Sequence, residues 1–528
     1  MIHWGWSGMS HDAALAVFDD DKLLFAAHSE RYTRVKNEKN LCQGLIDEAL
    51  TFGRPDNVHF YENTFLKKLR QVKSKQWNLL KKESPRKHMA QFGIDKYQHT
   101  TTHHRAHAAA GYFTSGFDSA TILVIDSIGE FDTLSVWEGK GKRLRKRQSQ
   151  GYPHSIGLWY SAMTQRLGLK PQEHEYILMG MAALGDPDKY YDIIMEDFFE
   201  EDPSNTHQLK VKFKRDLHRG CLDWRPDLNT VPDLVDVAAA VQKIYEKIFH
   251  NLLTEIYLSK LPTNLVLMGG CALNCVANSI AIQMPFISWE PHLKGTWEYS
   301  PHHIDDENTQ PQPYFDNVWI MPNPGDAGSA IGAVLAHTKT HIDFTTANLG
   351  HNIEGEYPVD QIINEIIQHK ITAVAAGKAE FGPRALGNRS ILADPRGLYV
   401  KNRVNRIKHR EEFRPFAPII LESCVAEYFN VAEDFKSPYM QYTVKCRRPD
   451  LYPAIVHYDG TSRVQTVNEK DNPEVYALLM KWYKITGCPM LLNTSLNIKG
   501  EPLVNTLEDA QRWELKYRVT VCTPTRGK

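Results

Sequence analysis

The sequence predicts an α/β protein with two domains, the first of which is built from two related halves. Three observations lead to this fold class. The chain has 528 residues, 42% of them apolar, which is too long for one ordinary core. Two strand-like hairpin patterns are accompanied by acidic loop residues, as a duplicated unit would repeat them. Two glycine-rich turns each open a helical segment.

The first half begins with a predicted β-hairpin. Residues 13–18 and 23–27 are apolar runs, and the polar residues 19–22 between them are typical of a turn. His11 and Asp12 lie on the loop that precedes the hairpin. We therefore expect these two side chains at the end of a strand, where a loop can present them to a ligand.

The second half is predicted to begin in the same way. Residues 121–125 form an apolar strand, Asp126 stands at its end, and residues 134–137 return toward a glycine turn at 139–141. An acidic residue beside both hairpins supports the duplication.

Glycine-rich turns mark two expected helix starts. The strand Leu265–Met268 runs into Gly269 and Gly270 and on to Asn274, and residues 325–332 form a comparable turn before an apolar helix. A helix amino terminus after such a turn can bind a phosphate or a ribose. The spacing fits an actin-like or sugar-kinase-like ATP domain with the nucleotide between two α/β halves.

A linker is predicted between the domains. Residues 338–357 mix Thr, Asn, Gly and His without clear periodicity. We place the first domain at residues 1–345 and the second at residues 356–528.

The sequence predicts an anion-binding segment at residues 380–390, near the start of the second domain. Gly382 and Gly387 allow the backbone to approach a ligand, while Arg384 and Arg389 offer planar forks of donors that match phosphate or carboxylate oxygens. Later segments of the domain add cations and neutral donors. They are Lys408, Arg414, Arg463, Asn493, Ser495 and Asn497. This mixture suits a ligand that has phosphate, sugar and carbonyl groups.

Two histidines suggest a metal site. His103 and His107 are four residues apart at the start of an expected helix, so they share one face and can chelate a divalent ion. Paired histidines are also common as surface or core residues. A zinc metalloprotease is excluded, because its motif needs Glu directly after the first His and this chain has His104 there.

The motifs of the second domain resemble those of the O-carbamoyltransferases of nodulation-factor and antibiotic tailoring. The segments that carry the resemblance are EFGPRALGNRSILADPR at 380–396, FRPFAP at 413–418, HYDGTSRVQTV at 457–467 and LLNTSLN at 491–497. The resemblance covers nearly the whole chain. It implies that the second domain is YrdC-like.

The resemblance implies a two-step reaction with carbamoyl phosphate as donor and ATP as activator. Carbamoyl-adenylate would form in the YrdC-like domain, and the actin-like domain would then transfer the carbamoyl group to an acceptor hydroxyl. Phosphate charge would be neutralised by Lys408, Arg384, Arg414 and Arg463, while Asn493 and Ser495 would hold carbamoyl or ribose groups. We count Arg389, Gly269, Gly270 and Asn274 among the binding residues.

The resemblance also completes the metal site. The histidine pair is joined by two aspartates that match Asp126 and Asp326, and the expected ion is Fe²⁺ or another divalent metal, with Mg²⁺ accompanying ATP. His11 and Asp12 are the candidates for the base that activates the acceptor, although a loop-capping Asp and a surface His would look the same.

Two departures from the family concern the acceptor side. Glu175 and Gly180 match an acceptor-side motif, but Ile177 stands where a lysine is usual. Residues 287–314 form an insertion rich in Trp, His, Pro and acids. It would serve as a lid or specificity element, or as a plain surface excursion.

Two basic tracts raise the question of a nucleic-acid acceptor. Residues 67–87 contain many lysines and arginines with Trp77, and residues 140–147 contain six cations. Such runs are often solvated surface. They also suit a nucleic-acid backbone, so the acceptor is either a small metabolite or a hydroxymethylated base in DNA such as 5-hydroxymethylcytosine, which would have to be flipped out of the duplex.

Two other functions are kept as alternatives. They are a non-enzymatic actin-like ATP sensor and a threonylcarbamoyl transferase that acts on tRNA.

Composition gives little further information on function. The net charge of −1 predicts no partner by itself. The eight cysteines lack paired metal spacings and are expected to be plain thiols. We find no membrane-spanning run and no signal peptide, expect a cytoplasmic location, and allow for a homodimer.

Overall fold

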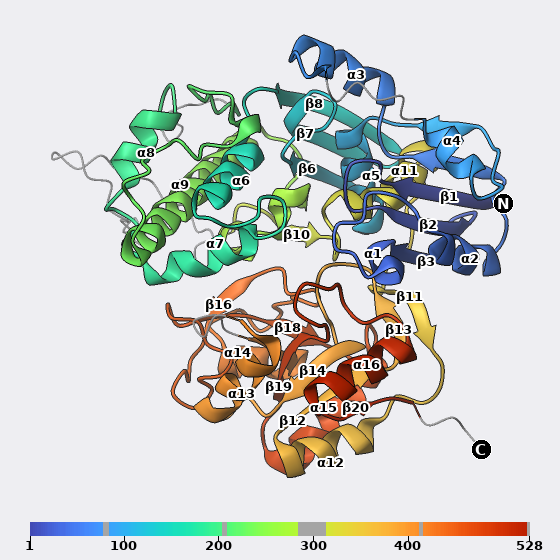
Figure 1. Cartoon of the computed structure of the whole chain (residues 1–528), viewed down its shortest axis with the longest axis vertical. Helices are drawn as coiled ribbons and strands as arrows, with labels where there is room; N and C mark the ends of the chain where they lie inside the picture. Colours follow the sequence, from blue (N-terminus) through green and yellow to red (C-terminus); the bar gives the residue numbers. More distant parts are fainter. Residues whose placement is uncertain (78–83, 203–208, 284–312, 411–415, 525–528) are drawn as a thin grey trace.

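The computed structural model describes residues 1–77, 84–202, 209–283, 313–410 and 416–524. The amino-terminal residues form the upper part of the molecule and the carboxyl-terminal residues the lower part (Figure 1). None of the helices within those ranges is long and apolar enough to cross a membrane.

The first domain contains two five-stranded sheets of the same topology. The first sheet has the order β3-β2-β1-β4-β5 and the second has β8-β7-β6-β9-β10, so each repeats one pattern of strands. In both, an antiparallel three-stranded meander continues into two parallel strands. The strands are β1 Ile2–Ser7, β2 Ala14–Asp19, β3 Lys22–His28, β4 Asn57–Phe60, β5 Gln98–Thr100, β6 Ser119–Ile125, β7 Asp132–Lys140, β8 Arg143–Gly151, β9 Asn264–Met268 and β10 Asn317–Ile320. The predicted duplication of an actin-like α/β unit, including both hairpins, is confirmed.

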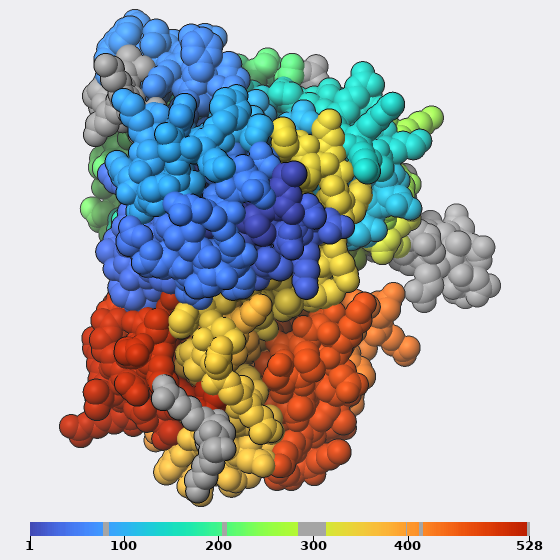
Figure 2. Space-filling model, turned by 90° about the vertical axis from the view of Figure 1, so that its right-hand side faces the viewer, coloured from blue at the N-terminus to red at the C-terminus, as the bar shows by residue number. Residues whose placement is uncertain are grey.

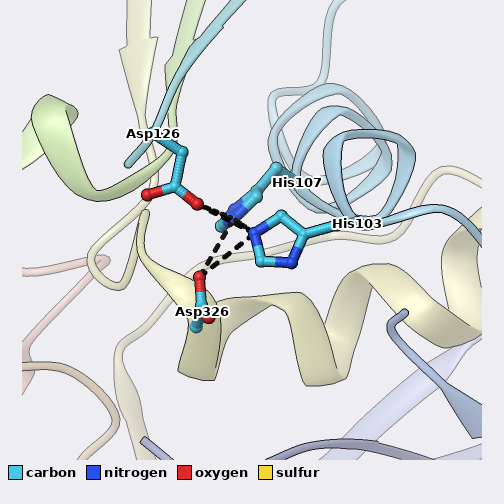
Figure 3. Close-up of side chains that lie close together, drawn as sticks. All are labelled: His103, His107, Asp126 and Asp326. Atoms are coloured by element: carbon cyan, nitrogen blue, oxygen red, sulfur yellow. Dashed lines mark hydrogen bonds and ion pairs between the residues drawn. The ribbon is translucent and has the colours of Figure 1, made fainter. Parts of the chain in front are cut away.

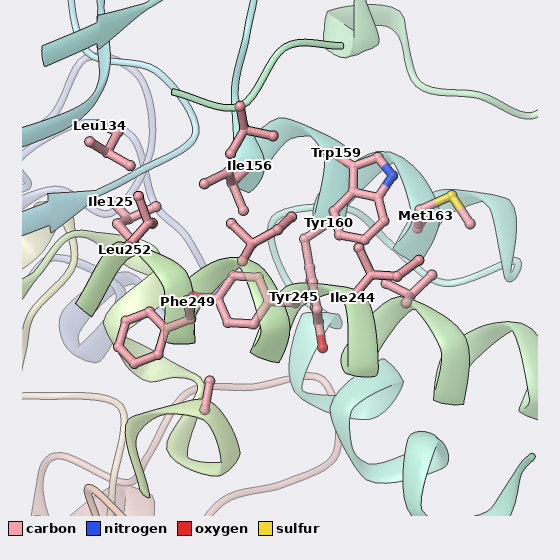
Figure 4. Packing of buried hydrophobic residues seen from close by; sticks show 14 of the residues in the cluster. Ile125, Leu134, Ile156, Trp159, Tyr160, Met163, Ile244, Tyr245, Phe249 and Leu252 are labelled. Carbon is pink, nitrogen blue, oxygen red and sulfur yellow. The ribbon is translucent and has the colours of Figure 1, made fainter. Parts of the chain in front are cut away.

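The helices of this domain cover the sheets and fill the space between them. They are α1 Glu30–Thr33, α2 Gln43–Thr51, α3 Thr64–Lys73, α4 Pro85–Ala90, α5 His103–Thr114, α6 Ile156–Arg166, α7 Glu175–Met181, α8 Tyr191–Phe198, α9 Val231–Leu258, α10 Cys275–Gln283 and α11 Ser329–Thr338. Helix α9 packs against α6 through buried residues such as Trp159, Ile244 and Tyr245 (Figure 4). This apolar core fixes the second half, and Asp126 follows its strand β6 directly.

Helices α5 and α11 bring the two halves together. Each follows the fifth strand of its sheet, and the two pack so closely that a Cβ on Gly332 would lie 1.9 Å from the carbonyl oxygen of Ala106. Only glycine allows this approach. The amino-terminal turn of α5 and the short 3₁₀ turn Asp326–Gly328 before α11 therefore meet at one place.

The second domain is an α/β unit on a six-stranded mixed sheet of order β18-β15-β19-β14-β12-β20, in keeping with the expected YrdC-like α/β domain. Its strands are β11 Asn348–Ile353, β12 Ile371–Ala375, β13 Gly377–Glu380, β14 Arg389–Ala393, β15 Ala417–Leu421, β16 Thr443–Lys445, β17 Thr461–Arg463, β18 Gln465–Val467, β19 Met490–Ser495 and β20 Val521–Cys522. Its helices are α12 Val359–His369, α13 Leu398–Lys408, α14 Val425–Tyr428, α15 Pro473–Thr486 and α16 Leu507–Tyr517.

The two domains are in contact (Figure 2). Strand β11 lies in the predicted linker and pairs with β13 of the second domain. The guanidinium of Arg34 donates to the carbonyl oxygens of Leu503 at 2.7 Å and Pro502 at 2.9 Å. The domain limits at 345 and 356, and the homodimer, stay predictions.

Candidate functional site

Four side chains from three segments converge at the meeting point of α5 and α11. Nε2 of His103 lies 2.8 Å from Oδ2 of Asp126 and 3.3 Å from Oδ1 of Asp326. Nε2 of His107 lies 3.6 Å and 3.4 Å from the same two oxygens (Figure 3). All four residues are buried, and their ligand atoms lie within 4.8 Å of one another.

Neighbouring groups fix the direction in which these side chains point. The hydroxyl of Ser329 lies 3.1 Å from Nδ1 of His107, so the other ring nitrogen faces the carboxylates. Oδ1 of Asp126 accepts hydrogen bonds from the backbone of Ser127 at 2.8 Å and Gly270 at 3.4 Å, which leaves Oδ2 for the histidines. Such outer partners orient the ligands of a metal.

The electrostatics of the cluster fit a divalent cation. Burial opposes the charged form of His103, but the carboxylates of Asp326 and Asp126 outweigh it and raise the pKa well above its usual value. The Nε2 atoms of His103 and His107 are only 3.1 Å apart. Two imidazole nitrogens and two carboxylate oxygens that face one common point form a donor set that suits a transition metal, so the cluster could hold one.

His11 and Asp12 lie beside this cluster. Nε2 of His11 is 3.7 Å from Oδ2 of Asp326, and Nδ1 is 3.1 Å from Oδ2 of Asp12. Burial disfavours the charged imidazole, yet the charges of Asp326 and Asp12 raise its pKa to about 9. A cation between the carboxylates would offset that attraction.

Two arginines of the second domain form a cationic site. Burial and the charge of Arg463 together lower the pKa of Arg384 to about 9, so the two guanidinium groups lie near each other. In the part of the chain that the structure describes, neither has an acidic partner. Half-buried cations without counter-charges can bind an anion.

Lys408 and the loop after β19 form a second part of this site. The ammonium of Lys408 donates to the carbonyl oxygen of Ser495 at 2.7 Å and to its hydroxyl at 3.0 Å, and it also contacts Asn497. The amide of Asn493 donates to the carbonyl oxygen of Ala385 at 3.0 Å, while its own oxygen is buried without a hydrogen-bond partner. Arg414 lies outside the described residues.

One cavity of about 910 Å³ joins the two sites. The residues singled out in the sequence that line it are His11, Asp12, Asp126, Glu175, Gly270, Asn274, Asp326, Arg384, Lys408, Arg463, Asn493 and Ser495. The metal cluster and the cationic site therefore share one space between the two domains.

Two expected binding residues have backbone roles instead. Arg389 is fully buried, and its guanidinium donates to carbonyl oxygens that include Ala376 at 2.9 Å and Asn505 at 3.1 Å. It does not line the cavity, because its donors bind the chain itself. Gly269 is also outside the lining, and its positive φ of 90° permits the tight turn after β9.

Sequence reasoning missed Arg31, Lys36 and His28, which line the cavity from the end of β3 and the segment after it. The sequence did contain a signal for these residues. Charged residues follow β3 closely, and β3 ends beside the loop that carries His11 and Asp12. Only the packing against the second domain shows which charges face the cavity.

Several charges of the basic tracts are already paired. Lys67 lies 2.8 Å from Glu62, Lys146 lies 2.7 Å from Asp132, and Arg147 pairs with Glu138. Arg70 is buried. Residues 78–83 of the first tract, and residues 287–312 of the expected insertion, lie outside the described residues.

Comparison with known proteins identifies the family. The carbamoyltransferase amino-terminal domain matches residues 59–286, and the carbamoyltransferase carboxyl-terminal domain matches residues 363–523. The chain belongs to the carbamoyltransferase family. This agrees with the resemblance inferred from the motifs of the second domain.

Individual carbamoyltransferase relatives extend over most of the chain. An uncharacterised protein of Synechocystis is 31% identical over 96% of this chain and 93% of its own length. Nodulation protein NolO of Bradyrhizobium diazoefficiens is 31% identical over 77% of this chain and 75% of its own length. The 3'-hydroxymethylcephem-O-carbamoyltransferase of Amycolatopsis lactamdurans is 27% identical over 94% of both chains. This carbamoyltransferase is an enzyme that transfers a carbamoyl group to a hydroxyl, as predicted.

Proposed function

We propose that this carbamoyltransferase makes carbamoyl-adenylate from carbamoyl phosphate and ATP, and then transfers the carbamoyl group to an acceptor alcohol. The observation that carries this proposal is one cavity lined by the cationic site at one end and by Asp126 and Asp326 of the His and Asp cluster at the other. A site for phosphate groups beside a site for a metal suits the formation and the use of a phosphoanhydride.

The first step belongs to the cationic site. To form a carbamoyl–AMP anhydride with loss of pyrophosphate, a carboxylate oxygen of carbamate must attack the α-phosphorus of ATP. The donor therefore has to lose its phosphate to water first. Arg384, Arg463 and Lys408 would stabilise the phosphate charge of both reactions, and Mg²⁺ would accompany ATP.

The second step belongs to the other end of the cavity. His103, His107, Asp126 and Asp326 would hold a divalent metal, which we propose to be Fe²⁺ and which would supply a Lewis acid for an oxygen of the reactants. His11, with Asp12 at its other ring nitrogen, would accept the proton of the acceptor hydroxyl.

We propose a small hydroxylated molecule as the acceptor. The argument is that several cations of the basic tracts are paired or buried, so the surface charge available to a nucleic-acid backbone is smaller than the sequence indicated. A hydroxymethylated base in DNA is the other acceptor class, and the same experiment distinguishes them.

The test uses the full chain with ATP, Mg²⁺, Fe²⁺ and carbamoyl phosphate. We expect pyrophosphate release that depends on the donor, and then one added carbamoyl group by mass spectrometry on a member of a panel of alcohols. Duplex DNA that contains 5-hydroxymethylcytosine is included in the panel. Carbamoylation of that DNA, with salt-dependent retention in a gel, would favour the nucleic-acid acceptor instead.

Three results would contradict the proposal. Pyrophosphate formation without any need for carbamoyl phosphate would remove the first step. ATP binding with no turnover of any kind would favour the sensor, and transfer of a threonylcarbamoyl group to tRNA would favour the threonylcarbamoyl transferase.

A further inference from the structure

Arg31 has unused hydrogen-bond donors in the middle of the cavity. It belongs to α1, is only 3% exposed and lines the cavity. Its Nη2 atom donates to the carbonyl oxygen of Gly382 at 2.7 Å. Within the described part of the chain, its Nε and Nη1 atoms are buried and have no hydrogen-bond partner. A buried cation that lines the cavity thus has two donors whose hydrogen bonds no group of the described residues satisfies.

The charge of Arg31 is compensated in part by the carboxylates of Glu30 and Glu380. Its Nε atom lies 3.6 Å from Oε1 of Glu30, whose other carboxylate oxygen accepts a hydrogen bond from the backbone of Asn37. Burial lowers the pKa of Arg31 despite this neighbour. A buried charge with unused donors costs free energy, which an anion in the cavity would offset.

The position of Arg31 lies between the two ends of the cavity. Gly382, which it contacts, is two residues before Arg384 of the cationic site. His28, at the end of the strand before α1, lies 3.0 Å from the amide of Asn323, three residues before Asp326 of the cluster. The side chain is therefore placed where an intermediate passes from one site to the other.

We propose that Arg31 binds the phosphate of the acyl adenylate during transfer and stabilises the charge that AMP gains on leaving. The inference rests on the proposed function. In the transfer, the acceptor oxygen bonds to the carbonyl carbon and the bond from that carbon to the bridging oxygen breaks. AMP keeps the electron pair, and the hydroxyl proton goes to the base. The additional negative charge forms on the phosphate that Arg31 contacts.

Arg34 provides a matched control from the same segment. Its guanidinium donates to the carbonyl oxygens of Leu503 and Pro502, so it joins the domains but does not line the cavity. A change at Arg34 reports on the cost of losing a domain contact, whereas a change at Arg31 reports on that cost together with the loss of the free donors.

The test compares Arg31→Met, Arg31→Lys and Arg34→Met in two assays with the full chain. We expect Arg31→Met to keep pyrophosphate release in the first turnover within about 2-fold, and to lower the rate of transfer by about 10²-fold. Arg31→Lys should recover part of that loss, since it keeps the charge. Calorimetric titration with AMP should show about 10-fold weaker binding to Arg31→Met than to Arg34→Met.

The inference fails if Arg31→Met binds AMP as tightly as the wild type, or if both steps fall by the same factor. Should Arg31→Met not fold, the comparison of Arg31→Lys with the wild type decides in the same way. Failure of the proposed function looks different, because then the wild type itself releases no donor-dependent pyrophosphate.

Discussion

At the scale of single residues, the cavity separates two kinds of charge. Aspartates gather with histidines at one end, and arginines without acidic partners face the other end among the described residues. Each kind should therefore control one step of the reaction. Substitutions that remove one charge and keep the shape of the side chain test this assignment.

Asp326→Asn should lower bound iron and block transfer while pyrophosphate release continues. The amide is a weaker ligand than the carboxylate, so we expect metal affinity to fall by at least about 10-fold. Metal content after dialysis, measured by mass spectrometry, checks this. Asp316→Asn is the control, because Asp316 is exposed before the same strand β10. Equal iron in both variants would contradict the assignment of the cluster.

Arg463→Met should abolish the first step. Arg384 and Lys408 would remain, but one of the three cations proposed to bind the phosphate groups would be lost, and we expect pyrophosphate release to fall by about 10²-fold or more. Arg448→Met, which removes an exposed arginine of the same domain, should leave the rate unchanged. A sensor would tolerate both changes equally.

At the scale of elements, the site depends on how closely α5 and α11 approach. His103 and His107 lie at the amino-terminal end of α5, Asp326 lies in the 3₁₀ turn before α11, and Gly332 permits the contact with the carbonyl oxygen of Ala106. Gly332→Ala should push the helices apart, destabilise the fold by about 1–3 kcal/mol and reduce iron binding. Thermal denaturation measures the loss of stability, and the metal content of the purified variant measures the loss of metal binding.

A second helical glycine gives the contrast. In Gly44→Ala the new Cβ would meet Tyr32 at an ordinary 3.4 Å, and alanine is the better helix former. That variant should melt at the same or a higher temperature and bind as much metal as the wild type. If Gly332→Ala behaved in the same way, helix contact would not position the ligands.

The elements also show how far the sequence could be interpreted. The hairpins and the strand, turn and helix units were predictable, because alternation and glycine turns are local patterns. The pairing of His103 and His107 followed from helix periodicity. The role of Arg389 did not, since its surroundings, including the carbonyl oxygens of Ala376 and Asn505, come from distant parts of the chain. For the same reason, only the packing between the domains shows that Arg31 faces the cavity.

At the scale of the whole molecule, the two domains enclose one reaction space. Local motifs in the sequence indicate two separate sites, whereas the cavity between the domains is lined by residues of both. A carbamate anhydride in water is exposed to hydrolysis. A shared cavity would let the intermediate reach the acceptor without entering bulk solvent.

This arrangement predicts that the intermediate is retained during turnover. The enzyme is first loaded with ¹⁴C-labelled carbamoyl phosphate and ATP, and is then mixed with acceptor and a large excess of unlabelled carbamoyl phosphate. If the adenylate stays in the cavity, most of the label bound at the time of mixing should appear in the carbamoylated product, since the bound intermediate reacts before it exchanges. Arg34→Met, which loosens the contact between Arg34 and the loop of Pro502 and Leu503, should release more label as free carbamate. The contrary result is a wild-type product whose labelled fraction equals the labelled fraction of all the carbamoyl phosphate in the mixture. It would mean that the intermediate leaves the protein, and that the cavity does not connect the steps.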